Sequence, residues 1–292
     1  MAGILDEQMW HGRIFTGKWT EPRGGVADDV EPATREVLTV VGDANAQDVA
    51  AACATAAEAQ IDWAARPVNE RAQILIEAAG KIQENHDELA GWIMRECGGV
   101  RAKADVELQD AVLRLQHAAA LTTQPVGEML PSLMPGRWSF AQRVPLGVVG
   151  VISPFNYPLI LSIRSVAPAL GVGNAVVLKP DIRTPISGGY LIARVLEEAG
   201  LPEGVLSVLP GAGAEAGNAL VEDPNTQAIS FTGSTPVGRA IGEKAGRLLK
   251  RVALELGGNN PFVVLADADV ELAAMAGSFG SFMHQEIGRA HV

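Results

Sequence analysis

The chain has 292 residues, of which 48% are apolar and 20% are charged, and aromatic residues are few. That length suffices for one large domain or two ordinary ones, and the composition is typical of an α/β enzyme. A formal net charge of -11 argues against nucleic acids and anionic membranes as partners, because the chain has no excess of cations to displace counterions. We therefore expect the partners to be small molecules or further copies of the chain.

The cysteines and the N-terminus narrow the class further. Cys53 and Cys97 stand alone in helix-like stretches, so they form neither a disulfide framework nor a zinc motif, and the histidines show no metal-ligand spacing. The start, MAGILDEQMWHGRIF, has no continuous apolar core, and the longest apolar run, PLGVVGVI, is too short to span a bilayer. We expect a cytoplasmic protein with no metal and no membrane anchor.

Helical periodicity dominates the first third of the chain. Apolar residues recur at helical spacing over residues 43–64 and 68–97, and Gly98 and Gly99 end the second stretch. Residues 124–142 are rich in Pro and Gly and have no helical period. This pattern predicts a hairpin that reaches away from the main body.

Beyond residue 142, short apolar runs alternate with helical segments near residues 187–199 and 236–249. The runs are GVVGVIS, AVVLKP, VLSVLP, AISFTGS, RVALELGG and PFVVLAD. Such runs are typical of parallel strands that are buried on both faces, so they predict an α/β fold with a Rossmann-type doubly wound sheet. Ligands of these sheets bind at the carboxyl ends of the strands, which makes the residues after each run the candidates for function.

Two glycine-rich turns are candidate phosphate sites. In FTGSTPVGRAIG, Gly233 precedes a helix start at Ser234 or Thr235, where free backbone N–H groups would suit a pyrophosphate. An ordinary capped helix explains this pattern equally well. The second turn, PGAGAEAG, resembles a dinucleotide fingerprint, but the strand after it lacks the acidic residue that would hold a ribose.

Three polar side chains follow other runs, and each has two readings. Lys179 could reach a ribose or phosphate, or could simply be a solvated strand end. Asn156, between Pro154 and Pro158, could aim its amide at an oxyanion or serve a turn. Glu255 could be a buried general base or a surface carboxylate.

The motifs SPFNYPL, LKP, FTGSTPVG and LELGGNNP, taken in this order, resemble the motif series of the NAD(P)-dependent aldehyde dehydrogenase superfamily. The resemblance extends from about Gly17 to Gln285. The segments RECGGVRAKADVEL and ISPFNYPLILSIRSVAPAL are most similar to those of benzaldehyde and salicylaldehyde dehydrogenases. A full-length parent would thus oxidise an aldehyde, and an aromatic one by this likeness, through a cysteine thioester.

The resemblance implies a role for each matching residue. Asn156 would donate its amide to the oxyanion, and Glu255 would activate the water that releases the acid. Lys179 would contact the adenosine ribose. The residues expected to line the rest of an NAD or NADP site are Ile152, Ser153, Pro154, Gly213, Phe231, Gly233, Ser234, Val237, Leu256 and Gly257. Residues 1–123 and 143–254 would form the cofactor-binding domain, 124–142 an oligomerisation hairpin of a homo-oligomer, and 255–285 the start of a catalytic domain.

The sequence departs from the family pattern at two places. Many NAD-preferring relatives carry Glu two residues after the Lys-Pro pair, where this chain has Ile182 followed by Arg183, so use of NADP is also expected. After MHQ the family has Gly-Gln-x-Cys with the nucleophilic Cys, whereas this chain has EIGRAHV, with Arg289 at the Cys position. The heptapeptide resembles a translated sequencing adapter.

We therefore interpret residues 286–292 as a non-native tail on an N-terminal fragment that lacks the catalytic Cys and is inactive by itself. A naturally truncated dinucleotide-binding protein without turnover is the alternative.

Overall fold

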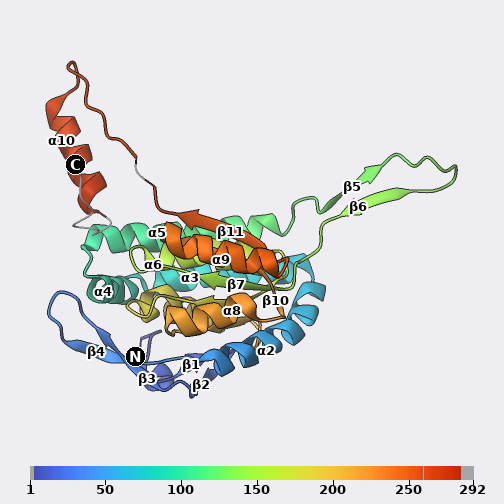
Figure 1. Cartoon of the computed structure of the whole chain (residues 1–292), viewed down its shortest axis with the longest axis horizontal. Coiled ribbons are helices and arrows are strands. Elements are labelled where there is room, and N and C mark those ends of the chain that lie inside the picture. The colour runs from blue at the N-terminus through green and yellow to red at the C-terminus, as the bar shows by residue number, and fades with distance from the viewer. Residues whose placement is uncertain (1–2, 259, 284–292) are drawn as a thin grey trace.

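A computed structural model describes residues 3–258 and 260–283 of the chain. Its centre is a seven-stranded sheet in the order β11-β10-β7-β8-β9-β1-β2. The pairs from β11 to β9 are parallel, and β1 and β2 extend the sheet with antiparallel pairs (Figure 1). The strands of this sheet are β1 (Ile14–Phe15), β2 (Trp19–Thr20), β7 (Val148–Ile152), β8 (Ala175–Lys179), β9 (Leu206–Val208), β10 (Thr226–Gly233) and β11 (Arg251–Leu256).

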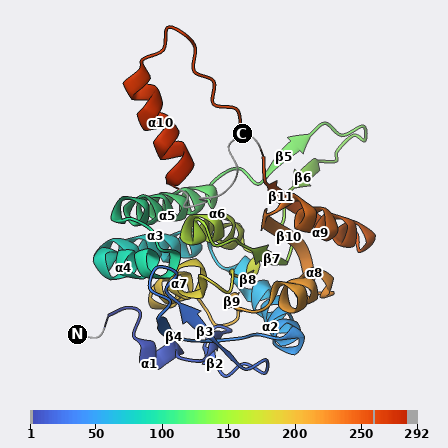
Figure 2. The ribbon, with the colours of Figure 1, turned by 60° about the vertical axis from the view of Figure 1, so that its left-hand side comes forward.

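Helices cover both faces of the sheet, which confirms the predicted doubly wound α/β fold (Figure 2). One face carries α3 (Val68–Glu84), α5 (Arg101–Leu121), α6 (Pro158–Gly171) and α7 (Leu191–Glu198). The other carries α2 (Ala46–Ala65), α8 (Asn218–Glu222) and α9 (Thr235–Arg247). Alternate residues of one strand serve the two layers: Val149 and Val151 pack in the first core, whereas Val148 and Ile152 pack in the second. Burial on both faces explains why the strands are nearly continuous apolar runs.

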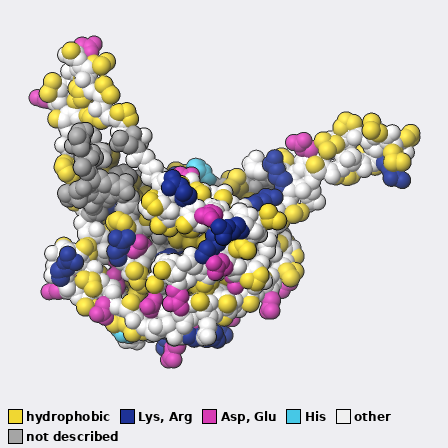
Figure 3. All heavy atoms as spheres, viewed as in Figure 1, with side chains coloured by type: hydrophobic (Ala, Val, Ile, Leu, Met, Phe, Trp, Pro, Cys, Tyr) yellow, Lys and Arg dark blue, Asp and Glu magenta, His cyan; other side chains and the backbone are white. Residues whose placement is uncertain are grey.

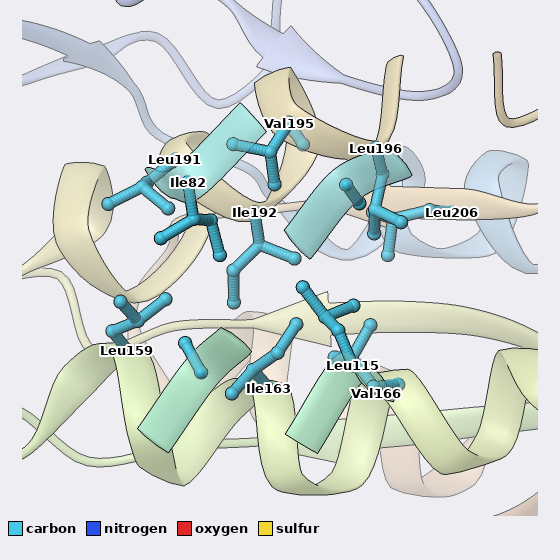
Figure 4. Close-up of a cluster of buried hydrophobic side chains, with 14 of the residues drawn as sticks. Ile82, Leu115, Leu159, Ile163, Val166, Leu191, Ile192, Val195, Leu196 and Leu206 are labelled. Atoms are coloured by element: carbon cyan, nitrogen blue, oxygen red, sulfur yellow. The ribbon is translucent and has the colours of Figure 1, made fainter. Parts of the chain in front are cut away.

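The larger core joins α3, α5, α6 and α7 to the sheet. Figure 4 shows Ile163 and Val166 of α6 and Leu115 of α5 on one side of this cluster, and Ile192 and Leu196 of α7 on the other. All of these side chains have essentially no exposed surface. The cluster therefore fixes α6, whose first turn belongs to the candidate site described below.

The N-terminal region is helical from residue 46 onward, as the sequence predicts, but its detail differs. The stretch 68–97 is two helices, α3 and α4 (His86–Cys97), because Asn85 leaves the helical conformation between them. Gly98 ends α4 with a positive φ of 70°, as expected of a glycine stop. The remaining elements of this region are α1 (Glu7–Trp10), β3 (Val26–Val30) and β4 (Val37–Gly42). Two π-helical turns lie later in the chain: η1 (Ile186–Tyr190) contacts α4, and η2 (Gly213–Gly217) contacts α2.

Residues 124–142 form the predicted hairpin. Its strands, β5 (Gly127–Leu130) and β6 (Ser139–Gln142), pair with each other and extend away from the body (Figure 1). Most of its large apolar side chains are exposed, among them Met129, Trp138 and Phe140, and hydrophobic atoms cover much of it in Figure 3. The hairpin exists as predicted, and its role in assembly stays a prediction.

The prediction of a strand for PFVVLAD is wrong. Residues 260–269 form no strand, and they lead to α10 (Val270–Phe282), which stands off from the body (Figures 1 and 2). Phe262, Val263 and Leu265 are exposed, since no strand in the described part of the chain lies beside them. An apolar segment forms a strand only where a neighbouring strand is present to pair with it. The predicted tail, residues 286–292, lies outside the described residues.

Among the described helices, none is long and apolar enough to cross a membrane.

Two buried carboxyl groups join the β3–β4 hairpin to the helical layer. Glu96 of α4 accepts N–H bonds from Ile186 at 2.6 Å and Ser187 at 2.7 Å, and also the Ser187 hydroxyl. Burial raises the pKa of Asp29 on β3 to about 7, and burial together with Asp29 raises the pKa of Glu96 well above its ordinary value. The two groups cannot both ionise easily, so the pair holds a proton at neutral pH.

This pair predicts a pH dependence of stability. A carboxyl whose pKa is higher in the folded chain stabilises the fold below its unfolded pKa and loses that contribution as the pH rises through the folded value. For Asp29 the free energy of unfolding should fall as the pH rises from about 4 to about 7. Asp29→Asn should flatten this slope in urea unfolding at several pH values. Asp28→Asn, at the exposed neighbouring position of β3, is the control. An unchanged slope in Asp29→Asn would contradict the assignment.

Candidate functional site

A cleft of about 1070 Å³ opens at the carboxyl ends of β7, β8, β10 and β11. Every residue predicted for the site lies on its wall. They are Ile152, Ser153, Pro154, Asn156, Lys179, Gly213, Phe231, Gly233, Ser234, Val237, Glu255, Leu256 and Gly257. These residues come from segments up to about a hundred positions apart in sequence. The fold therefore brings the separate motifs together on one cleft. Their binding and catalytic roles stay predictions.

Strand register explains how they meet. In the parallel ladder Ile152 lies opposite both Lys179 of β8 and Phe231 of β10. One strand further, Thr232 lies opposite Glu255 of β11. Because all these strands run the same way, their last residues fall on one edge of the sheet.

The turn between β10 and α9 forms one wall of the cleft. Ser234 is the N-cap residue in an extended conformation and Pro236 lies in the first turn, yet within the described chain no side chain caps this helix. Its first backbone N–H groups thus remain available to an anion. A Cβ built on Gly233 would lie 2.6 Å from the Phe231 ring, so only glycine lets that ring keep its place.

Lys179 is buried, with 6% of its surface exposed. The interpretation of Lys179 as a solvated strand end is therefore wrong. Its Nζ donates to the carbonyl oxygens of Pro180 at 2.8 Å and Gly211 at 3.1 Å. Burial lowers the pKa of Lys179, against the opposing effect of Asp181 and Asp43. The side chain joins the β8 end to the glycine-rich turn at Gly211, and its aliphatic stem passes 3.8 Å from the position of a Cβ on Gly217.

Hydrogen bonds within the loop and to α6 hold the loop that carries Asn156. The Asn156 side-chain oxygen accepts the N–H of Tyr157 at 3.1 Å. Ser153 and Ser162 share a hydroxyl hydrogen bond of 2.6 Å, which ties the loop to α6.

A buried ion pair from α5 supports the start of α6. Glu107 Oε2 accepts the N–H groups of Leu159 at 3.0 Å and Ile160 at 3.4 Å, and Oε1 accepts Lys103 Nζ at 2.5 Å. Lys103 also lies 4.7 Å from the centre of the Tyr157 ring. Both side chains of the pair have no exposed surface. Burial raises the pKa of Glu107, and Lys103 opposes that effect. The sequence motif gave no sign of this support, because it comes from a different helix.

Glu255 lies on the cleft wall, but the burial expected of it is absent. β11 is an edge strand of the sheet, and most of its residues, Glu255 included, are exposed. No described element covers this edge. Glu255 is therefore an exposed residue of the cleft wall, and its catalytic role stays a prediction.

Sequence reasoning did not find Arg164, and it named Arg183 only in connection with the use of NADP, although both line the cleft. Arg164 of α6 donates to Thr232 Oγ1 at 2.8 Å, beside the register position of Glu255. At another part of the wall, Arg183 pairs with Asp181 and stacks on Phe155. Arg164 lies in the middle of α6, and no motif identified in the sequence marked it.

Neither cysteine of the described chain lines the cleft. Cys53 of α2 is buried against Thr226, and burial raises its pKa to about 12. Burial also raises the pKa of Cys97. A thiol held in its neutral form is a poor nucleophile, so these two have no catalytic role in the cleft. Among the described residues, no group of His, Cys, Asp or Glu is arranged to hold a metal ion.

A cleft at the carboxyl ends of parallel strands, with a glycine turn leading into a helix, is the arrangement of dinucleotide-binding α/β proteins. The sequence profile described as "Aldehyde dehydrogenase family" matches residues 19–286. The chain belongs to the aldehyde dehydrogenase family.

Two similar proteins are named for aromatic aldehydes. The chain is 58% identical over 282 residues to a vanillin dehydrogenase of Amycolatopsis sp., and this match covers 97% of the chain and 58% of the relative. It is 51% identical to a benzaldehyde dehydrogenase [NAD(+)] of Pseudomonas putida, over 98% of the chain and 58% of the relative.

Solved structures agree with this likeness. The crystal structure of an NAD-dependent benzaldehyde dehydrogenase from Corynebacterium glutamicum superposes with a TM-score of 0.88 at 46% identity, covering 94% of this chain and 60% of that one. The chain thus spans less than two thirds of the length of these relatives, and corresponds to their N-terminal portion.

The buried ion pair under Asn156 leads to a stability prediction. Lys103→Met should lower the free energy of unfolding by about 3 kcal/mol or more, because it leaves the Glu107 carboxylate buried without its cation. The double variant Lys103→Met with Glu107→Gln should be more stable than Lys103→Met alone, since the amide oxygen still accepts the N–H groups of α6. Urea unfolding measures both.

The matched control is Arg114→Met, which breaks a surface pair with Asp110 on the same helix. It should cost less than about 1 kcal/mol. If Lys103→Met costs no more than Arg114→Met, the buried pair does not hold this loop.

Proposed function

We propose that this chain is the cofactor-binding part of an enzyme that oxidises an aromatic aldehyde to the carboxylic acid with NAD or NADP. The observation that carries the proposal is that residues of four separate motifs line one cleft at the strand ends. The likeness to a vanillin dehydrogenase and a benzaldehyde dehydrogenase supports the aldehyde class. The Pseudomonas putida relative and the Corynebacterium structure are NAD enzymes by name, which supports the cofactor class.

The cleft fits a dinucleotide on two grounds. First-turn N–H groups of α9 and the absence of a Cβ at Gly233 suit a pyrophosphate. The segment Ile152-Ser153-Pro154 and the pair Leu256-Gly257 line the walls on either side of that turn. When bound, the nicotinamide would supply the hydride acceptor. Lys179, at the end of β8, would contact the adenosine ribose.

The remaining roles belong to side chains of this chain. Asn156 would donate its amide N–H to the oxygen of the attacked carbonyl, as an oxyanion donor. Glu255 would take the proton of the water that hydrolyses the acyl group. A nucleophilic thiol completes such a reaction, and neither cysteine in the described chain reaches the cleft. By itself the chain would therefore bind a dinucleotide without turnover.

The assembly proposal rests on the projecting hairpin. Its exposed Trp138 and Phe140 form an apolar surface of the kind that protein interfaces cover. Pairing of this hairpin with another copy would account for a homo-oligomer of the complete enzyme.

The proposal predicts dinucleotide binding by the purified chain. NADH fluorescence should shift on binding, and Gly233→Ala should weaken the affinity about tenfold or more, because the new Cβ displaces the Phe231 ring at the phosphate turn. Gly246→Ala, later in α9, has no heavy atom within 4 Å of the added Cβ and should leave affinity unchanged.

The same chain should show no benzaldehyde-dependent reduction of NAD or NADP above a blank without protein. Equal NADH affinity in Gly233→Ala and Gly246→Ala would contradict the phosphate site. Reduction of NAD by the chain would contradict the absence of a nucleophile.

A further inference from the structure

Two lysines of the described chain, Lys179 and Lys244, line the cleft, and only Lys244 forms an ion pair, with Glu222 at 2.6 Å. The Lys179 nitrogen donates instead to two backbone carbonyl oxygens, those of Pro180 and Gly211. A neutral amine has two N–H groups and one lone pair, so these two acceptors satisfy its donors and leave the lone pair free. An ammonium ion has a third N–H group to satisfy. The surroundings of Lys179 therefore suit the neutral amine.

The charges near Lys179 do not restore its cationic form. Burial lowers the pKa of Lys179 and Arg183 acts in the same direction, whereas Asp181 and Asp43 act to raise it, and the net effect is a lowered pKa. Asp181 pairs with Arg183 at 2.8 Å, so part of its charge is offset. A larger share of this amine is uncharged at neutral pH than in a solvated lysine, and the uncharged amine is the nucleophile.

Apolar side chains flank the amine. Ile152 lies opposite Lys179 on one side and opposite Phe231 on the other, so these three side chains project from the same face of the sheet. Pro154 and Ala214 line the same cleft, whose volume of about 1070 Å³ leaves room for an aromatic ring. An uncharged amine beside apolar surface in an open cleft is the environment of lysines that condense with carbonyl compounds.

We propose that Lys179 captures aromatic aldehydes covalently when no dinucleotide occupies the cleft. The Lys179 nitrogen forms a bond to the carbonyl carbon, the two amine protons leave with the carbonyl oxygen as water, and a C=N bond replaces the C=O bond. The step consumes no oxidant or reductant. The product is an imine whose aryl group lies against the apolar wall near Ile152 and Phe231.

This capture goes beyond the proposed function and has a consequence for it. In the proposed function Lys179 contacts the ribose, so the imine and a dinucleotide exclude each other. Free aldehyde in excess would therefore block the cofactor side of the cleft, and a dinucleotide bound first would prevent the block.

Reductive trapping on the 292-residue chain tests the capture site. Benzaldehyde and sodium cyanoborohydride at neutral pH convert each imine into a stable benzylamine, and peptide mass spectrometry measures the labelling rate of every lysine. Lys179 should be labelled about tenfold or more faster than Lys244, since each unit by which burial lowers the pKa of Lys179 raises its uncharged fraction about tenfold. Lys250, whose pKa burial also lowers but which does not line the cleft, should lag behind Lys179 as well.

Two controls show whether the fold sets this reactivity. In the urea-unfolded chain, Lys179 and Lys244 should be labelled at the same rate. In the folded chain, Asp181→Asn should speed labelling of Lys179 about threefold or more, because it removes a charge that raises the pKa of Lys179. Asp110→Asn, which removes a carboxylate outside the cleft, should leave the rate unchanged. Circular dichroism checks that both variants are folded.

The outcomes separate the capture site from the proposed function. NADH at about ten times its dissociation constant should slow labelling of Lys179 about tenfold and leave the exposed Lys81 unaffected. Fast labelling of Lys179 that NADH does not slow supports the capture site and contradicts the dinucleotide site. Labelling of Lys179 no faster than that of Lys244 or Lys250, in a chain that still binds NADH, overturns the capture site and leaves the proposed function standing.

Discussion

Parallel pairing of β8, β7, β10 and β11 is the constraint on which the cleft depends. Because these strands run in one direction, the side chains at their carboxyl ends share an edge, and Ile152 meets both Lys179 and Phe231 there. A shift of one residue in this register would turn each of these side chains to the other face of the sheet. The two buried cores, with alternate residues of β7 in each, hold the register in place.

Carboxyl groups of α4 and α5 attach the surrounding elements to that frame. Glu107 of α5 accepts N–H groups at the start of α6, and Glu96 of α4 accepts those at the start of η1. Near the N-terminus, the partly buried carboxylate of Glu88 accepts the N–H groups of Ile4 and Leu5, which precede α1. The first N–H groups of a helix or turn lack partners within it, so an acceptor from a neighbouring element both satisfies them and fixes their position. Burying the Lys103–Glu107 ion pair costs free energy, which suggests that this pair is kept for orientation more than for stability.

The sequence predicted the sheet well because its strands are buried on both faces. Short apolar runs such as AVVLKP, bounded by Gly and Pro, predict buried parallel strands. PFVVLAD has the same composition but no partner strand among the described residues, and composition says nothing of partners. The strands β1 to β4 escaped prediction because they are short or half-exposed, so no clear period marks them.

The sequence predicted those residues of the candidate site that belong to recognisable motifs. Residues next to glycine turns and strand ends, such as Gly233 and Lys179, carry a local signal. Lys103 and Glu107 lie in the segment RECGGVRAKADVEL, but nothing in that segment indicates that they contact the start of α6. Glu255 was placed correctly on a strand end, but its exposure depends on which element covers β11, and sequence spacing does not contain that information.

The central claim is that the cleft at the strand ends is a dinucleotide site, and amide hydrogen exchange measured by mass spectrometry with and without NADH tests it most directly. The account predicts slower exchange with NADH in three segments of the wall, residues 152–157, 179–183 and 233–238. Exchange in the projecting hairpin, residues 127–142, should not change, since it lies away from the cleft (Figure 1). Unchanged exchange in all three wall segments at saturating NADH, or protection confined to the hairpin, would contradict the account.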